Sequence, residues 1–120
     1  MSWELLVLEI KTDDYCIHHD PASATVFLQG FLRLDGMEEY QPVMDILLQA
    51  VDETPEFTIN LRELEFLNSS GISMLSMFVV KVREKGNVKL TFQGSDKILW
   101  QTKSLKNLQR LMPSLTLEFV

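Results

Sequence analysis

The sequence contains a single cysteine, Cys16, so no disulfide can form within one chain. A lone cysteine is typical of a protein from a reducing compartment. The segment Met1 to Leu6 lacks the basic stretch that precedes the apolar core of a signal peptide. No apolar run approaches the roughly 18 residues that a membrane-spanning helix needs. We therefore expect a cytoplasmic protein that does not enter the membrane.

Basic residues are also few. The 120 residues include 11 Lys and Arg against 17 Asp and Glu, a net charge of -6. Without clustered basic and aromatic residues, this composition argues against a nucleic-acid partner. Hydrophobic residues make up 46% and charged residues 23% of the chain, as in an ordinary globular core. The length predicts one domain over residues 1–120.

Metal ligands are equally scarce, since the chain has only two histidines, His18 and His19. Adjacent residues of a strand point to opposite faces, so these two cannot chelate one ion together. No cysteine or histidine spacing matches a zinc site. We expect no metal and no cofactor.

The charges are divided unevenly along the chain. Residues 1–65 hold 14 acidic and 3 basic residues, a net charge of -11, whereas residues 66–120 hold 3 acidic and 8 basic residues, a net charge of +5. Such a division can produce surfaces of opposite sign. Alternatively, the two halves interleave in the fold and the charges are simply solvated, which is the interpretation we favour from sequence.

Strands dominate the first third of the sequence. A short apolar run predicts a strand over residues 4–10, followed by a turn at residues 11–14. Two further strands are expected at residues 15–19 and 25–34. Gly30 interrupts the second of these, as at a bulge.

Helical periodicity then appears. Apolar residues spaced i, i+3, i+4, i+7 and i+8 predict a helix over residues 43–51, with Pro42 in its first turn. A strand follows at residues 57–61, with Phe66 and Leu67 in a connection. Residues 69–85 are again helical, and Gly86 ends that helix.

The remaining residues continue the alternation. A strand is expected at residues 88–92 and a last strand at residues 115–119. Between them we expect a third helix, capped by Ser95 or Asp96 and extending toward Leu111, either continuous or with a break. Helices between consecutive strands indicate parallel crossovers, whereas the early hairpins indicate antiparallel pairs. The sequence therefore predicts an α/β fold, a mixed β-sheet covered by helices.

A polar run lies where the second helix begins. Asn68, Ser69 and Ser70 precede Gly71 and Ile72. Asn and Ser side chains accept hydrogen bonds from the free N–H groups of a first helical turn, so ordinary capping explains this run on spacing alone.

The same run resembles the Asp-Ser-Ser/Thr-Gly-Leu signature of STAS domains, the family of bacterial anti-sigma-factor antagonists. Two further segments are similar to that family: Leu28 to Leu32 resembles the strand around its Gly-Glu-Leu, and Lys85 to Leu90 resembles its glycine-containing entry to the next strand. The expected element order from Tyr15 to Phe119 also fits. The fold class is then a STAS-like mixed sheet, with residues 1–14 as an additional N-terminal strand and turn.

The resemblance implies a partner switch in signal transduction and transcription regulation. In the family, the first serine of the signature is phosphorylated by a serine kinase that is also an anti-sigma factor, and a serine phosphatase resets it. Ser69 occupies that position, with Asn68, Ser70 and Gly71 supporting it. A phosphate at a helix N-terminus is tolerated by the fold but adds about -1.5 to -2 charges to a binding surface.

Two departures from the family pattern leave an alternative open. Asn68 replaces the family's aspartate, and Arg33 replaces an acid near the family's partner surface. The alternative is a constitutive scaffold, or a subunit of a larger signalling or transport complex, that is not phosphorylated. On either interpretation Arg33, Met74 and Met77 are candidates for the partner surface. Exposed methionine suits adaptable interfaces, but partial burial of Met74 and Met77 in the core is an equally open alternative. The extra N-terminal strand is expected to cover a sheet edge or to pair between two copies in a homodimer.

A serine hydrolase is the third hypothesis, and it is disfavoured. Ser69 lacks the Gly-x-Ser-x-Gly turn of a nucleophile, and neither histidine is placed to serve as its base. We therefore expect no catalytic residues and a protein that is not an enzyme.

Overall fold

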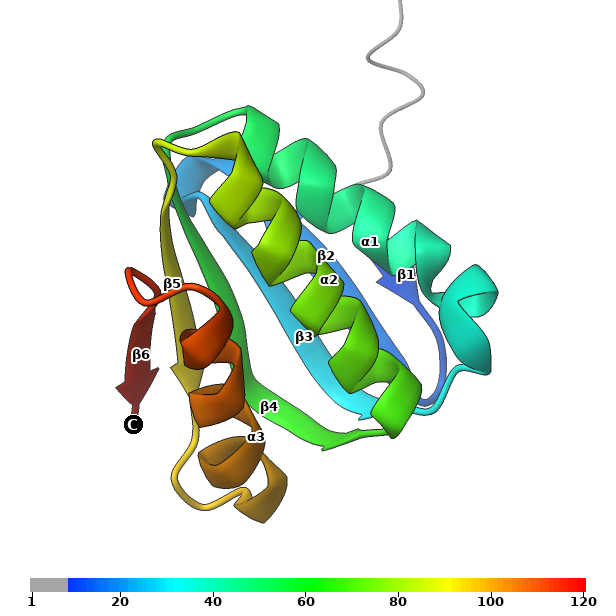
Figure 1. Ribbon diagram of the computed structural model, residues 1–120. Helices are drawn as coiled ribbons and strands as arrows, with labels where there is room; N and C mark the ends of the chain where they lie inside the picture. The colour runs from blue at the N-terminus through cyan, green and yellow to red at the C-terminus, as the bar shows by residue number, and fades with distance from the viewer. Residues whose placement is uncertain (1–8) are drawn as a thin grey trace, which may run out of the picture.

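The computed structural model describes residues 9–120, which form a six-stranded sheet and three helices (Figure 1). The strands and α-helices are β1 (Glu9–Lys11), β2 (Tyr15–Asp20), β3 (Thr25–Leu32), α1 (Gly36–Asp52), β4 (Glu56–Leu67), α2 (Ser69–Lys85), β5 (Lys89–Gly94), α3 (Leu99–Leu111) and β6 (Thr116–Phe119), and a short 3-10 helix, Pro21–Ser23, joins β2 to β3. This order confirms the predicted α/β arrangement. Residues 4–8 of the predicted first strand lie outside the described residues. No helix within residues 9–120 is long and apolar enough to cross a bilayer.

The strands lie in the sheet in the order in which they occur in the chain, from β1 to β6. The pairs β1–β2 and β2–β3 are antiparallel, and the pairs from β3 to β6 are parallel. Three right-handed crossovers that advance in the same direction place all three helices on one face of the sheet, as Figure 1 shows. Within residues 9–120, no helix covers the other face of the sheet.

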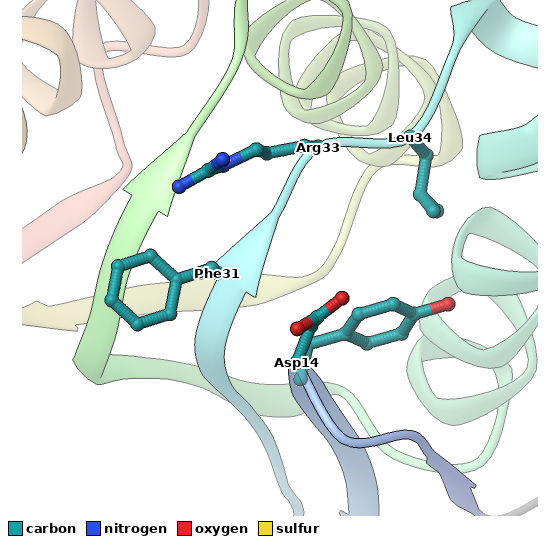
Figure 2. A pocket seen from close by; sticks show the side chains of 5 residues that line it. Asp14, Phe31, Arg33 and Leu34 are labelled. Carbon is teal, nitrogen blue, oxygen red and sulfur yellow. The ribbon is translucent and has the colours of Figure 1, made fainter.

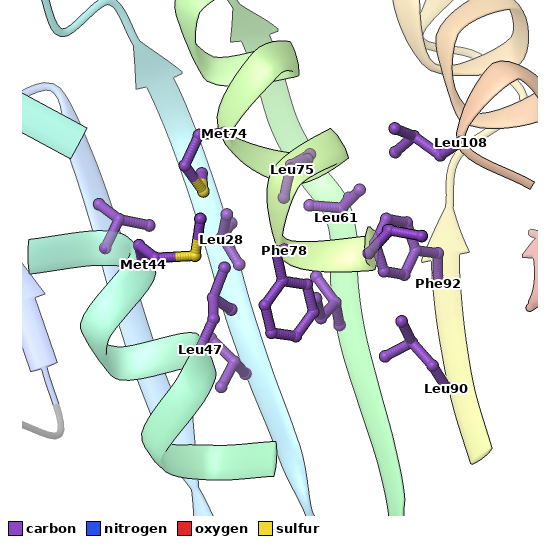
Figure 3. Close-up of a cluster of buried hydrophobic side chains, with 14 of the residues drawn as sticks. Leu28, Met44, Leu47, Leu61, Met74, Leu75, Phe78, Leu90, Phe92 and Leu108 are labelled. Carbon is purple, nitrogen blue, oxygen red and sulfur yellow. The ribbon is translucent and has the colours of Figure 1, made fainter. Parts of the chain in front are cut away.

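The core lies between the sheet and these helices. Each helix presents its apolar stripe to the sheet, and buried residues of β3, β4 and β5 face that stripe. Figure 3 shows the centre of this cluster, where Phe78 of α2 packs among side chains from α1 and the strands. The labelled members are Leu28, Met44, Leu47, Leu61, Met74, Leu75, Phe78, Leu90, Phe92 and Leu108.

Strand β4 is longer than its sequence pattern predicts. The prediction that Phe66 and Leu67 lie in a connection is wrong, because they pair with Phe31 and Leu32 of β3. The register shifts within β4 bury both Leu61 and Leu64, which breaks the alternation that marks a strand in sequence.

A buried glutamine stabilises this irregularity. Gln101 of α3 is fully buried, and its Nε2 donates to the carbonyls of Leu61 (2.6 Å) and Leu64 (2.9 Å). Its Oε1 accepts from Ser95 N at 2.8 Å. Trp100 Nε1 also donates to the Leu64 carbonyl, at 3.1 Å. These bonds satisfy the backbone groups that the bulge in β4 leaves unpaired.

Two predicted helix starts are corrected. Helix α1 begins at Gly36, so Pro42 is inside it rather than in its first turn. The side chain of Pro42 is exposed, so the hydrogen bond that it removes lies on the solvent side. Helix α3 begins at Leu99 without a side-chain cap, so Ser95 and Asp96 do not cap it.

The interpretation that the two halves of the chain interleave is wrong. Because the strands follow chain order, β1, β2, β3 and α1 occupy one side of the molecule, and β5, α3 and β6 occupy the other (Figure 1). The uneven charge of the sequence therefore becomes an uneven charge in space. One side of the molecule is acidic and the opposite side is basic.

Candidate protein-binding site at the start of helix α2

The site is built where β3 and β4 end, side by side. Asn68 N donates to the Leu32 carbonyl at 3.2 Å, so the chain is still tied to β3 at the residue before α2. The carboxyl ends of neighbouring parallel strands form one edge of a sheet, and this edge carries Arg33 and Ser69. The sequence motif and Arg33 are thus brought to the same end of the molecule.

Asn68 is the cap of α2 and joins three elements. Its Oδ1 accepts from Gly71 N at 3.0 Å and from the Tyr40 hydroxyl of α1 at 2.7 Å. Its Nδ2 donates to the Leu34 carbonyl at 2.8 Å, in the connection between β3 and α1. An aspartate, the residue of the STAS signature, has no hydrogen to donate to that carbonyl. The asparagine therefore suits the local hydrogen bonding.

Tyr40 lies under the cap and is fully buried. Burial raises the pKa of Tyr40 above its ordinary value, because the phenolate would be desolvated. Gly71 lies against the same ring: a Cβ at this position would come within 2.7 Å of Tyr40 Oη. The glycine of the motif is explained by this close approach of α2 to α1 and β4.

Ser69 is the first residue of α2, and its side chain is exposed. Within residues 9–120 neither the Ser69 nor the Ser70 hydroxyl makes a hydrogen bond. The capping interpretation is confirmed for Asn68 but does not extend to the two serines. The Ser69 hydroxyl is consequently exposed to solvent, at a helix N-terminus that favours an anion.

An aromatic–arginine surface, made of Phe31, Arg33 and Phe66, flanks this helix start. The Arg33 guanidinium lies 5.7 Å from the centre of the Phe31 ring and 5.0 Å from that of Phe66. Both rings are exposed, at 41% and 39%. They are neighbours because Phe31 pairs with Phe66 in the β3–β4 register. Exposed aromatic rings and arginine are the residue types enriched at the centres of protein interfaces.

A shallow hollow adjoins this surface. It has a volume of about 230 Å³ and is lined by Asp14, Tyr15, Phe31, Arg33 and Leu34 (Figure 2). Gly30, at a φ of 93°, lets β3 approach the turn before β2, where Phe31 N donates to the Asp14 carbonyl at 2.9 Å. The exposed edge therefore carries a recess beside the aromatic–arginine surface.

The two methionine candidates differ in exposure. Met77 is 45% exposed and lies about two turns after Ser69 on α2. Met74 is completely buried and packs in the core near Leu28 and Met44 (Figure 3). The expectation that Met74 contributes to a partner surface is therefore wrong, because α2 is covered on two sides, by the sheet and by α1.

Phe31 and Phe66 were missed by the sequence reasoning. Phe66 follows the bulge in β4, and no alternation pattern shows on which side of the strand it lies. The only available signal was the presence of two phenylalanines close to the motif residues. The strand register, a tertiary feature, brings them together.

Neither histidine lies close enough to Ser69 to act as its catalytic base. Both histidines are in β2, where His19 pairs with Val26 at the start of β3, the opposite end of the sheet from Ser69. His18 is exposed and His19 is buried, as expected for adjacent strand residues. Among residues 9–120, no three His, Cys, Asp or Glu side chains are grouped as a metal site.

Comparisons with known proteins give the fold. No family model matches the chain, and no curated protein matches its sequence. The structure is similar to a chain in the complex of the diguanylate cyclase SiaD with its activator SiaC from Pseudomonas aeruginosa, with a TM-score of 0.69, 14% identity, and coverage of 94% of this chain and 98% of that one. SiaC by itself gives a TM-score of 0.64 at 12% identity, covering 95% and 97% of the two chains, and apo-SiaC gives 0.64 at 13%, covering 94% and 98%. The mixed α/β fold is thus one used by an enzyme activator.

Proposed function

We propose that this chain is a non-enzymatic regulatory protein that binds another protein and is switched by phosphorylation of Ser69. The observation that carries the proposal is the free, exposed hydroxyl of Ser69 at a helix start whose cap is supplied by Asn68. A phosphate can be added there without removing any hydrogen bond of the described fold. The aromatic–arginine surface beside it supplies the contact area for a partner.

The physical basis of the switch is a separation between folding and binding. The N–H groups and dipole of α2 stabilise an anion on Ser69, so the fold persists. The same anion adds about -1.5 to -2 charges to the binding surface. A partner that docks on the unmodified form is then disfavoured by repulsion and by the cost of desolvating the phosphate. Phosphorylation therefore changes what the protein binds without unfolding it.

The partner proposal rests on two comparisons. The STAS resemblance implies a serine kinase that modifies Ser69 and a phosphatase that resets it. That resemblance also implies an anti-sigma role for the kinase, whereas SiaC is the activator of a cyclase, SiaD. We therefore propose a kinase as the modifying partner and control of an enzyme, rather than of a sigma factor, as the output.

The test compares pull-downs from the native organism with wild-type, Ser69→Asp and Ser69→Ala baits, read by mass spectrometry. Ser73→Asp is the matched control, because Ser73 is also exposed and lies one turn further along α2. We expect the wild-type, Ser69→Ala and Ser73→Asp baits to retain a kinase-like ATPase that Ser69→Asp loses. If all four baits retain the same proteins, Ser69 is not a switch.

A constitutive scaffold is the second candidate function. It is favoured by Asn68 and Arg33, which replace two acids of the family pattern. Under this proposal the chain binds its partner through the same surface and Ser69 is never modified. A phosphopeptide containing Ser69, recovered from cells in stoichiometric amount, would contradict the scaffold and support the switch.

A further inference from the structure

Strand β6 forms an open edge of the sheet on the basic side of the molecule. It pairs with β5 on one side and, within residues 9–120, has no strand on the other (Figure 1). Val120 N donates to the Gly94 carbonyl at 3.0 Å, toward β5. Because the N–H direction alternates along a strand, the N–H groups of Leu117 and Phe119 point to the open edge. An open edge of this kind is a template for another strand.

A groove runs between this edge and α3. It has a volume of about 660 Å³, and its lining residues come from α3, β6 and the connection between them: Lys106, Gln109, Arg110, Pro113, Leu117 and Phe119. Leu117 and Phe119 face α3 and are only partly buried. They form an apolar floor beside unpaired backbone groups.

The wall of the groove carries uncompensated positive charge. Lys103, Lys106 and Arg110 lie on α3 at positions i, i+3 and i+7, all exposed, and the helix contains no acidic residue. Within residues 9–120, no carboxylate oxygen lies within 4.0 Å of the charged nitrogens of these three residues. By contrast, Lys85 Nζ lies 2.7 Å from Asp52 Oδ1. Three cations in a chain of net charge -6 are too few for nucleic acid, but they complement a short acidic segment.

We propose that β6 and α3 form a second protein-binding surface, which takes an extended acidic and apolar segment of a partner protein as a seventh strand. Backbone bonds to the open edge of β6 hold the segment, its apolar residues cover Leu117 and Phe119, and its acids meet Lys106 and Arg110. This second surface lies at the opposite edge of the sheet from β1, and its binding does not depend on Ser69.

The test is selection from a phage-displayed library of random ten-residue peptides, with the full chain as bait. We expect enriched peptides to place Asp or Glu and Val, Ile or Leu two residues apart, so that both lie on the face of the added strand that meets α3. One enriched peptide is then titrated into the isotopically labelled protein by NMR, where the largest shifts are expected at the amides of Leu117 and Phe119.

The matched variants separate this surface from a general effect of charge. The double variant Lys106→Glu, Arg110→Glu should bind the enriched peptide at least tenfold more weakly than wild type. Lys81→Glu with Lys89→Glu makes the same change in net charge at exposed positions outside the groove, and it should leave the affinity within about twofold.

Three results would overturn the proposal. The first is a library that yields no peptide, or only basic ones; the second is binding that is equal in both double variants. The third is that the wild-type protein self-associates and the Lys106→Glu, Arg110→Glu variant is monomeric. A second copy of the chain would then occupy the groove. None of these results bears on the Ser69 switch, which a Ser69→Asp bait tests separately.

Discussion

The hydroxyl of Tyr40 donates to Asn68 Oδ1 at 2.7 Å, which ties the cap of α2 to the buried side of α1. The same oxygen accepts from Gly71 N, and the Asn68 amide nitrogen donates to the Leu34 carbonyl. One side chain thus holds together α1, the start of α2 that carries Ser69, and the connection after β3 that carries Arg33.

Asn68→Asp should lower the free energy of unfolding by about 1–3 kcal/mol, although it restores the residue of the STAS signature. The carboxylate can still cap α2, but it faces the Leu34 carbonyl without a hydrogen to donate. Urea denaturation measures the change, with Ser70→Ala as the control, expected within about 0.5 kcal/mol of wild type. Equal stability of Asn68→Asp would show that the bond to Leu34 contributes nothing.

Gly71→Ala should destabilise the protein by about 1–3 kcal/mol. Alanine is the better helix former, by about 1 kcal/mol, so propensity alone predicts the opposite sign. The added methyl group meets Tyr40 Oη and the Leu67 side chain, neither of which has free space to move. The melting temperature of Gly71→Ala, measured by thermal unfolding, decides between them: a decrease supports the steric clash and an increase supports helix propensity.

Stability should fall in alkaline solution through Tyr40. Burial raises its pKa above the ordinary value of 10.0, so the unfolded chain loses this proton at a lower pH than the folded chain. The stabilisation is complete below about pH 10 and is lost as the pH rises toward the folded-state value. Tyr40→Phe should be less stable than wild type at pH 8 and should show a smaller loss between pH 9 and 11, as measured by urea denaturation. Equal losses would assign the pH dependence to other groups.

Gln101→Leu should lower the free energy of unfolding by about 2–4 kcal/mol, because it leaves buried backbone groups of the β4 bulge without partners. The control is Gln41→Leu, at an exposed position of α1 where only a bond to Asp45 is lost. A small effect at Gln101 would mean that water replaces the amide. Chemical denaturation of both variants gives the comparison.

Ser69→Asp should leave the free energy of unfolding unchanged or raise it by up to about 1 kcal/mol, because a negative charge at the first residue of α2 favours the helix dipole. Ser69→Lys should lower it by a similar amount. Urea denaturation of both variants at low salt measures the difference. A strongly destabilised Ser69→Asp would contradict a switch that acts on binding alone.

Part of the site was predictable because its signals are local. Asn68 as a cap, Gly86 as a helix end and the exposed position of Ser69 follow from residues within one or two turns of each other. The bulge in β4, the burial of Met74 and the pairing of Phe31 with Phe66 were not predictable. They depend on strand register and on which side of α2 meets α1, and neither is specified by any short segment.

The sequence by itself determined the order of strands and helices, the start of α2 at Ser69 and the uneven charge along the chain. Hydrophobic periodicity, capping and composition are properties of neighbouring residues. Only the tertiary structure decided that Arg33 stacks on two phenyl rings beside Ser69 and that the basic residues of α3 face an open strand edge. Both arrangements join residues distant in the chain, and the physical reason is the sheet. Its register sets which side chains meet, and its sequential strand order turns a charge difference along the chain into one across the molecule.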